Sequence, residues 1–282
     1  MRPLILIIVL YLAGSSMALA QPVVVASIRP LQLIAAAITE GVSETLLVMD
    51  SSQDPHHPSL KPSQRRAMNQ ADIFIWIGPQ LETGMEQIVA QLSATVLPAL
   101  QISDLRIYQL NNKPDPHIWL DTDNVRLIAR SLTKALIEID RQNENQYSAN
   151  LTRFHQQLDV LDEEISDTLQ APGFPPFAVY HDGYQYFEKQ FSLSHRTSFT
   201  SNEEVQPGIR QVLAIKSVLD SDNVNCIVVD PSVNTENLGN QLERSNLRFI
   251  SVDVLAHDIP LAGDAYLRFM NNMASNFSSC RD

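Results

Sequence analysis

ENQYSANLTRFHQQLDVLDEEISDTLQA, residues 144–171, carries an apolar side chain at every third or fourth position over most of its length. The residues of this stripe are Leu151, Phe154, Leu158, Leu161, Ile165 and Leu169. This spacing places them on one face of an α-helix, so the pattern predicts one helix of about 26 residues, roughly 40 Å long. A helix of that length between two blocks of a different pattern indicates a connector between two domains.

The segment before this helix is also helical in pattern. From about residue 122 onward the apolar residues are again spaced by three and four, and no β-type run occurs before residue 171. These residues are Val125, Ile128, Leu132, Leu136 and Ile139. The Pro- and Gly-rich run APGFPP, residues 171–176, then ends the connector and starts a second domain.

Short β-type runs lie on both sides of this helical region and alternate with helical patterns. The runs are VVVAS (23–27), TLLVM (45–49), DIFIWIG (72–78), FAVYH (177–181), CIVVD (226–230) and FISVDV (249–254). Alternation of this kind is typical of βαβ units, and continuous apolar runs indicate strands that are covered on both faces. The predicted fold class is therefore α/β, with two lobes, each a mostly parallel β-sheet flanked by helices, joined by one long connector helix.

The first twenty residues read as an export signal. Arg2 supplies the charged start, an apolar run follows, and Ala18-Leu19-Ala20 matches an A-x-A cleavage site, so cleavage is expected after Ala20. No other run approaches the ~20 apolar residues that cross a bilayer, and no Cys follows the cleavage site to carry a lipid, so we expect an exported chain without a membrane anchor. The predicted divisions are 1–20 signal peptide, 21–143 N-terminal α/β lobe, 144–171 connector helix and 172–282 C-terminal α/β lobe.

The chain is acidic, with 20 Lys and Arg against 32 Asp and Glu and a formal charge of −12. Loss of Arg2 with the signal leaves 19 basic residues, which makes the mature charge −13. That balance argues against nucleic acid as a partner and is compatible with cation binding.

Cys226 and Cys280 are the two cysteines. In an oxidising compartment two cysteines favour one structural disulfide, the alternative being two buried thiols. Closing a loop of some fifty residues would contribute about 4 kcal/mol to stability.

Three of the seven histidines lie in predicted loops or at the end of a predicted strand. His56 lies in DPHHPSLKPS, His117 in DPHIWLD ahead of a short β-type stretch, and His181 closes the run FAVYH. Asp253 closes the run FISVD. Because ligand clefts of open α/β sheets form at the carboxyl ends of strands, these four side chains are predicted to converge.

Three neutral imidazoles and one carboxylate form an N3O set that suits Zn2+ better than Mn2+ or Mg2+. The alternative is that these are ordinary surface or strand-end residues. His57 and His257 are weaker candidates for a secondary metal position or its entrance. We interpret His155 as a solvated flank of the connector helix and place His195 in a β-like run.

On the basis of these residues and the segments around them, the sequence resembles the zinc-binding component of bacterial ABC metal importers, the ZnuA-like solute-binding proteins of the cluster A-I metal-binding family. The resemblance spans the mature chain, through SIRPLQLIAAAITEGV, HHPSLKPSQRRAMNQADIFIWIGPQLE, DPHIWLD, YHDGYQYFEKQF, TSNEEVQPG and FISVDVL. It implies two α/β lobes on one long helix, with the metal between them.

Carried over by motif, the resemblance selects His56 over His57 and adds His117 and His181 as ligands. Manganese-binding relatives have Glu in place of His181, so the match favours zinc. Asp253 matches an aspartate that serves as fourth ligand in some relatives, where water or another carboxylate serves in others. The resemblance also supports a bridge between Cys226 and Cys280.

Three features depart from the family pattern. The segment DLRIYQLNNKPDPH is short and lacks the extra histidines of a zinc-specific loop, so secondary capture by that loop should be missing. The usual Asp-Pro-Leu-Gly reads DVLA at 253–256, and Pro55 replaces a Glu found before the first ligand in some relatives, with Asp54 one step further away.

The resemblance implies an extracytoplasmic protein, expected to be a monomer, that binds one Zn2+ as its cargo and delivers it to the membrane permease of an ABC zinc importer. Two other classes stay open at this point. A zinc-dependent hydrolase needs an open coordination position, which Asp253 would fill, and the chain has no HExxH helix. A metal-binding adhesin would need a surface attachment.

Overall fold

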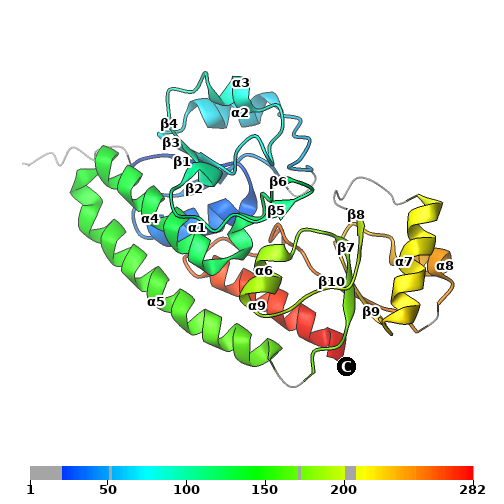
Figure 1. The fold of residues 1–282 in the computed structure, drawn as a ribbon. Coiled ribbons are helices and arrows are strands. Elements are labelled where there is room, and N and C mark those ends of the chain that lie inside the picture. Colours follow the sequence, from blue (N-terminus) through cyan, green and yellow to red (C-terminus); the bar gives the residue numbers. More distant parts are fainter. Residues whose placement is uncertain (1–20, 51–52, 171–172, 201–207, 245, 282) are drawn as a thin grey trace, which may run out of the picture.

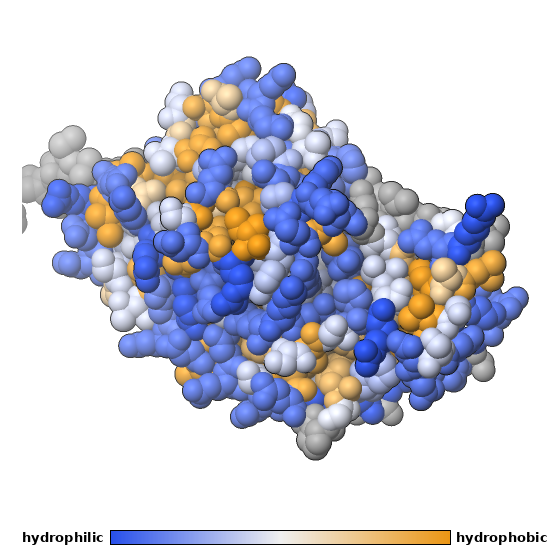
Figure 2. All heavy atoms as spheres, viewed as in Figure 1, coloured by the Kyte–Doolittle hydropathy of each residue, from blue (hydrophilic) through white to orange (hydrophobic). Residues whose placement is uncertain are grey.

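The long helix predicted from the opening stretch is α5, Glu144–Leu169, and it has the expected 26 residues. Its buried face consists of Tyr147, Asn150, Phe154, Leu158, Leu161, Ile165 and Leu169. Arg281 closes its carboxyl end by donating to the carbonyl oxygens of Thr168 and Leu169, as a cation does at the negative end of a helix. The band that α5 occupies in Figure 1 is mostly hydrophilic in Figure 2, so the helix turns its polar face outward.

The structure, a computed structural model, describes residues 21–50, 53–170, 173–200, 208–244 and 246–281. The expected signal peptide and its cleavage site lie outside these residues, as does residue 171 at the end of the predicted connector. Within the described part, no helix has both the length and the apolar character needed to cross a membrane.

The N-terminal lobe is built on a parallel sheet of order β2-β1-β3-β4. Its strands are β1 Val24–Ala26, β2 Thr45–Leu47, β3 Ile73–Trp76 and β4 Thr95–Pro98. Every residue of β1 and β3 is buried, as continuous apolar runs predict. The helices of this lobe are α1 Arg29–Thr39, α2 Pro62–Asn69 and α3 Glu86–Val89.

The C-terminal lobe repeats the plan with a parallel sheet of order β10-β9-β7-β8. Its strands are β7 Phe177–His181, β8 Ser198–Thr200, β9 Cys226–Val229 and β10 Arg248–Ser251. Its helices are α6 Gln185–Gln190, α7 Ile209–Ser221, α8 Thr235–Leu242 and α9 Ala265–Ser278. In Figure 1, α7 and α8 lie together at the far side of this sheet, away from the N-terminal lobe.

Helices hold the two lobes together. α4, Thr122–Ile139, begins at Asp121, whose side chain accepts from the backbone N–H groups of Asp123 and Asn124. α1, α4 and α9 all pack on α5 (Figure 1), and one continuous cluster of buried apolar residues runs from β1 and β3 through these helices to β7 and β9. A smaller apolar cluster lies under α7 and α8. The α/β fold with a long joining helix is therefore confirmed.

The remaining elements are short. β5 Gln109–Leu110 and β6 Lys113–Pro114 form an antiparallel hairpin. The 3-10 turns among the described residues are η1 Ala99–Gln101, η2 Ile118–Leu120, η3 Arg141–Asn143 and η4 Ser279–Arg281. η2 corrects the β-type stretch expected after His117, and the β-like run expected around His195 is irregular until β8 begins at Ser198.

The disulfide between Cys226 and Cys280 is present, with the two Cα atoms 5.5 Å apart. It ties the first residue of β9 to the turn that follows α9. Both residues are buried, so the bridge fixes the end of the chain against the C-terminal sheet.

Candidate metal centre

His56 enters the site from the loop that follows β2. Asp54 shapes this loop, because its carboxylate accepts a hydrogen bond of 2.8 Å from the backbone N–H of His56. An aspartate bonded to the backbone two residues ahead is a common turn device, and it suits the Pro-rich composition of this segment. The side chain of His56 is partly buried.

His117 lies immediately before η2 and is only 2% exposed. The buried carboxylate of Asp115 accepts from the His117 backbone N–H at 3.0 Å and lies 2.7 Å from its Nδ1. When Nδ1 carries the proton that this contact favours, Nε2 is the ring atom with a lone pair for a metal. Burial acts to raise the pKa of Asp115, but the nearby His117 and hydrogen bonds from His117 and Gln185 outweigh it and lower that pKa.

His181 is the last residue of β7 and is fully buried. Gly183, two residues further on, leaves space beside it. A Cβ atom at position 183 would lie 2.8 Å from Cε1 of His181 and 3.1 Å from Nε2 of His117. The first of these distances is shorter than real Cβ contacts and the second is unusually short, so glycine at this position keeps the space between the two imidazoles open.

The three histidines come together although 125 positions separate the first from the last. Each offers one ligand nitrogen, and these nitrogens all lie within 4.8 Å of one another. The ring centroids are 6.0 Å apart for His56 and His117, 6.2 Å for His56 and His181, and 5.1 Å for His117 and His181. In a tetrahedral site with zinc–nitrogen bonds of about 2.0–2.1 Å the nitrogens lie roughly 3.4 Å apart, so a bound zinc ion would draw these three nitrogens closer together. The donor set therefore fits a divalent ion.

Asp253 does not belong to this group of histidines. It lies two residues beyond β10, and its carboxylate accepts from the backbone N–H groups of Leu255 at 2.8 Å and His257 at 2.6 Å. Burial acts to raise the pKa of Asp253, but the hydrogen bonds and the charge of His257 outweigh it and lower that pKa. Its predicted role as a ligand stays a prediction.

His57 and His257 also lie outside the group. The side chain of His57 is 58% exposed, with Nδ1 3.1 Å from Oδ2 of Asp54. Nδ1 of His257 lies 3.3 Å from Oδ1 of Asp253. A crevice of only about 10 Å³, bordered by Pro55 and His257, separates the loop of His56 from the loop of Asp253. Secondary metal binding by either residue stays a prediction.

Trp119 joins the two lobes beside the site. It is fully buried, its ring centroid lies 5.2 Å from that of His117, and its Nε1 donates to the carbonyl oxygen of Val254 at 2.9 Å. Tyr266 of α9 donates in turn to the carbonyl oxygen of Trp119 at 2.7 Å. The segment that carries His117 is therefore fixed to the loop that carries Asp253.

The two remaining histidines have other contacts. Nε2 of His155 on α5 lies 3.3 Å from the carbonyl oxygen of Arg126, and burial lowers its pKa. His195 lies 2.8 Å from Glu188. Burial acts to lower the pKa of His195, but Glu188 and Asp182 outweigh it and raise that pKa.

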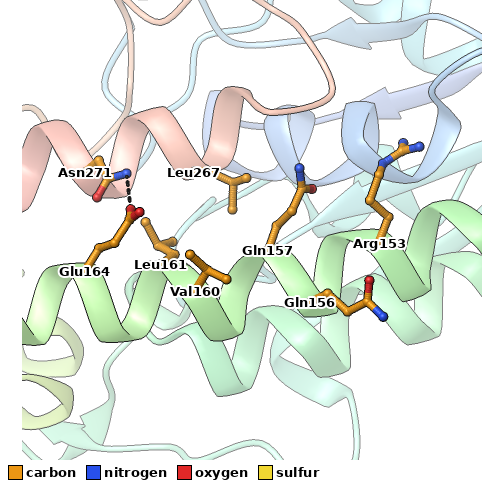
Figure 3. A pocket seen from close by; sticks show the side chains of 8 residues that line it. All are labelled: Arg153, Gln156, Gln157, Val160, Leu161, Glu164, Leu267 and Asn271. Atoms are coloured by element: carbon orange, nitrogen blue, oxygen red, sulfur yellow. Dashed lines mark hydrogen bonds between the residues drawn. The ribbon is translucent and has the colours of Figure 1, made fainter.

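A larger pocket, of about 360 Å³, lies between α5 and α9, and His56, His117 and His181 are not among its lining residues (Figure 3). Its apolar lining residues are Val160, Leu161 and Leu267, and a hydrogen bond joins Glu164 to Asn271 at one end. Its lining includes one carboxylate and no histidine or cysteine, so its donor set does not fit a metal centre.

Sequence reasoning missed the residues that support the ligands. Asp115, Gly183, Gln185 and Trp119 all lie within the quoted motifs DPHIWLD and YHDGYQYFEKQF. The order Asp-Pro-His was a usable signal, since an aspartate two residues before a histidine can accept from its backbone N–H. The contact of Gln185 with Asp115 gave no such signal, because it joins residues 70 positions apart.

Two α/β lobes on a connector helix, with imidazoles from both lobes meeting between them, define the class of metal-binding solute-binding proteins. Comparison with known proteins narrows the class. The family model of the zinc-uptake complex component A, periplasmic (ZnuA) matches residues 24–280. The chain therefore belongs to the ZnuA family, whose members are periplasmic solute-binding proteins and not enzymes.

Individual relatives agree with this assignment. The chain is 30% identical to the high-affinity zinc uptake system protein ZnuA of Yersinia pestis over 292 residues, which covers 93% of this chain and 92% of that relative. The fold matches a crystal structure of ZnuA with a TM-score of 0.78 at 22% identity, covering 92% of this chain and 96% of that one. It also matches the periplasmic zinc binding protein TroA from Treponema pallidum, with a TM-score of 0.79 at 18% identity, covering 93% and 99% of the two chains.

Proposed function

We propose that this protein captures one Zn2+ ion in the cleft between its lobes, as cargo, and delivers it to the permease of an ABC importer. The observation that carries the proposal is the convergence of His56 and His117 from the N-terminal lobe with His181 from the C-terminal lobe. Because both lobes supply ligands, the affinity for the ion depends on the relative position of the two lobes.

The donor chemistry supports zinc as the cargo. Three imidazoles are softer ligands than the oxygen-rich shells that Mg2+ and Mn2+ prefer. Asp115 strengthens the set, because a carboxylate on Nδ1 fixes the ring orientation and raises the basicity of the ligand nitrogen. We propose water or the carboxylate of Asp253 for the fourth position. The hydrolase alternative has no support, since the family consists of binding proteins.

Burial of the ligands supports delivery to a partner instead of free exchange with the solvent. His117 is 2% exposed and His181 is fully buried, so an ion held between them is shielded from water. The relatives that match over nearly their whole length are named as zinc uptake proteins. We propose that residues 1–20 direct export to the periplasm, that lobes 21–143 and 172–282 hold the ion, and that the chain acts as a monomer with a permease as its partner.

The experiment that tests capture is calorimetric titration of chelator-stripped protein with zinc and with manganese. We expect one tight zinc equivalent, much weaker manganese, and a large loss of zinc affinity in His56→Ala, His117→Ala and His181→Ala. His155→Ala is the matched control, because His155 lies on α5 and outside the histidine group. Zinc binding that survives all three ligand substitutions would overturn the proposal.

The experiment that tests delivery is the effect of zinc-loaded protein on an ABC zinc permease reconstituted from the same organism. We expect the loaded protein to bind the permease and zinc to be transported across the vesicle membrane. The His181→Ala protein should support little zinc transport. Binding to a host or matrix ligand with no binding to the permease would favour the adhesin alternative.

A further inference from the structure

The carboxylate of Asp115 accepts hydrogen bonds from residues of both lobes. Its Oδ1 accepts from the backbone N–H of His117 at 3.0 Å and lies 2.7 Å from Nδ1 of the same residue. Its Oδ2 accepts from Nε2 of Gln185 at 3.1 Å. Gln185 is the first residue of α6 and lies four positions after His181. The C-terminal lobe therefore contacts the group that orients a ligand of the N-terminal lobe.

The backbone around Asp115 is held by other bonds. Tyr186 donates from its hydroxyl to the carbonyl oxygen of Asp115 at 2.9 Å and accepts from the backbone N–H of Tyr108 at 3.2 Å. The N–H of Asp115 donates to the carbonyl oxygen of Tyr108 at 2.9 Å. Removal of the Gln185 side chain would leave these bonds in place. It would also remove the bond of 3.3 Å from Nε2 of Gln185 to the carbonyl oxygen of Gln109, so a double-mutant cycle with Asp115→Ala is needed to isolate the effect on the carboxylate.

We propose that Gln185 is a positioning residue for zinc binding, which couples the contact between the lobes to the strength of His117 as a ligand. This inference rests on the proposed zinc-binding function. A carboxylate held only through one oxygen can turn about its Cβ–Cγ bond, and the bond from Gln185 to the second oxygen fixes its plane. With the plane fixed, the His117 ring presents Nε2 to the cleft.

Two effects oppose each other when this bond is lost. A donor on Oδ2 withdraws electron density from Asp115, so its removal would strengthen the contact with His117 and raise ligand basicity. Its removal also frees the carboxylate to rotate in a buried setting. We expect the geometric effect to dominate, because groups behind a metal ligand change affinity by about 10- to 100-fold and a hydrogen bond to a charged group typically corresponds to about tenfold.

Gln190 supplies a matched control on the same helix. It also bridges the lobes, since its Oε1 accepts from the backbone N–H of Thr122 at 3.0 Å and its Nε2 lies 3.3 Å from Asp162. Neither of these bonds involves Asp115 or any of the three histidines. A general weakening of lobe contacts would therefore appear in both glutamine variants, whereas loss of ligand positioning would appear in one.

The test is the zinc dissociation constant of Gln185→Ala, Gln190→Ala and the unchanged protein, with the melting temperature of each zinc-free form. We expect zinc binding about tenfold weaker in Gln185→Ala, within about threefold of the unchanged protein in Gln190→Ala, and similar melting temperatures. Gln185→Glu, which places a second carboxylate against Asp115, should bind zinc more weakly still.

A double-mutant cycle separates positioning from a structural role. Gln185→Ala should weaken zinc binding less than twofold further when it is added to Asp115→Ala, because the group through which it acts is gone. Equal losses in the two glutamine variants, an additive double mutant, or unchanged or tighter binding in Gln185→Ala would overturn the inference. Absence of tight zinc binding in the unchanged protein would instead overturn the proposed function, and this inference with it.

Discussion

Removal of the disulfide should cost stability without loss of zinc binding. In the double variant Cys226→Ala, Cys280→Ala, the loop of 54 residues is no longer closed in the unfolded chain. The chain-entropy relation gives a loss of about 4 kcal/mol for a loop of that length. Alanine fits both positions, which are 3% and 6% exposed, without burying a new polar group.

Zinc affinity should stay within about threefold of the unchanged protein in this variant, because the bridge and the ligand lie at opposite ends of the same sheet. Cys226 pairs with Phe177 in the β7–β9 ladder. His181 lies four residues further along β7, or roughly 13 Å away at the rise of an extended strand.

The assay is urea unfolding of both zinc-free proteins, followed by far-ultraviolet circular dichroism, together with zinc titration of each. Zinc-free samples are needed because a bound ion adds its own binding energy to the apparent stability. A loss below about 1 kcal/mol would refute the loop-entropy argument. A large loss of zinc affinity would refute the separation of the bridge from the site.

Three further outcomes are expected. Gly183→Val should weaken zinc binding strongly with little effect on the circular dichroism spectrum, because the valine side chain would occupy the space between His117 and His181. The check is zinc titration of the folded variant. Burial raises the pKa of the Glu82 carboxyl from 4.5 to about 7, so the native state binds the carboxyl proton more tightly than the unfolded chain does. The stability that this proton contributes is fully present below pH 4.5 and is lost as the pH rises through 7. The free energy of unfolding should fall by about 3 kcal/mol over that window relative to Glu82→Gln, as measured by urea unfolding at several pH values. Asn150→Ala should lose about 1–3 kcal/mol in the same assay, because its buried amide donates to two carbonyl oxygens at the end of α1.

The architecture was predictable where the sequence pattern was long or strongly apolar. α5 was expected at its full length, because six apolar residues keep one spacing over nineteen positions. β4 was missed, since Thr95–Pro98 is a partly exposed edge strand that ends in proline. The stretch after His117 was expected as β-type and is a 3-10 turn, because three residues are too few to distinguish the two periods.

His117 follows the antiparallel hairpin of β5 and β6, so strand-end geometry does not account for its place in the site. The convergence of His56 and His181 was predictable, because each lies beyond or at the carboxyl end of a parallel strand, β2 or β7, where ligand clefts form. The supporting contacts of the site were not. The bond from Gln185 to Asp115 and the bond from Trp119 to Val254 join residues far apart in the chain, and only the packing of the two lobes brings them together. The position of Asp253 outside the histidine group depends on its loop, where its carboxylate binds the backbone N–H groups ahead of it.

The measurement that tests the central claim most directly is the crystal structure of the zinc-loaded protein, with anomalous diffraction recorded on both sides of the zinc absorption edge. We predict one anomalous peak bonded to His56, to Nε2 of His117 and to His181 at about 2.0–2.1 Å. A zinc peak elsewhere in a fully loaded crystal, with the three imidazoles left without an ion, would contradict the account.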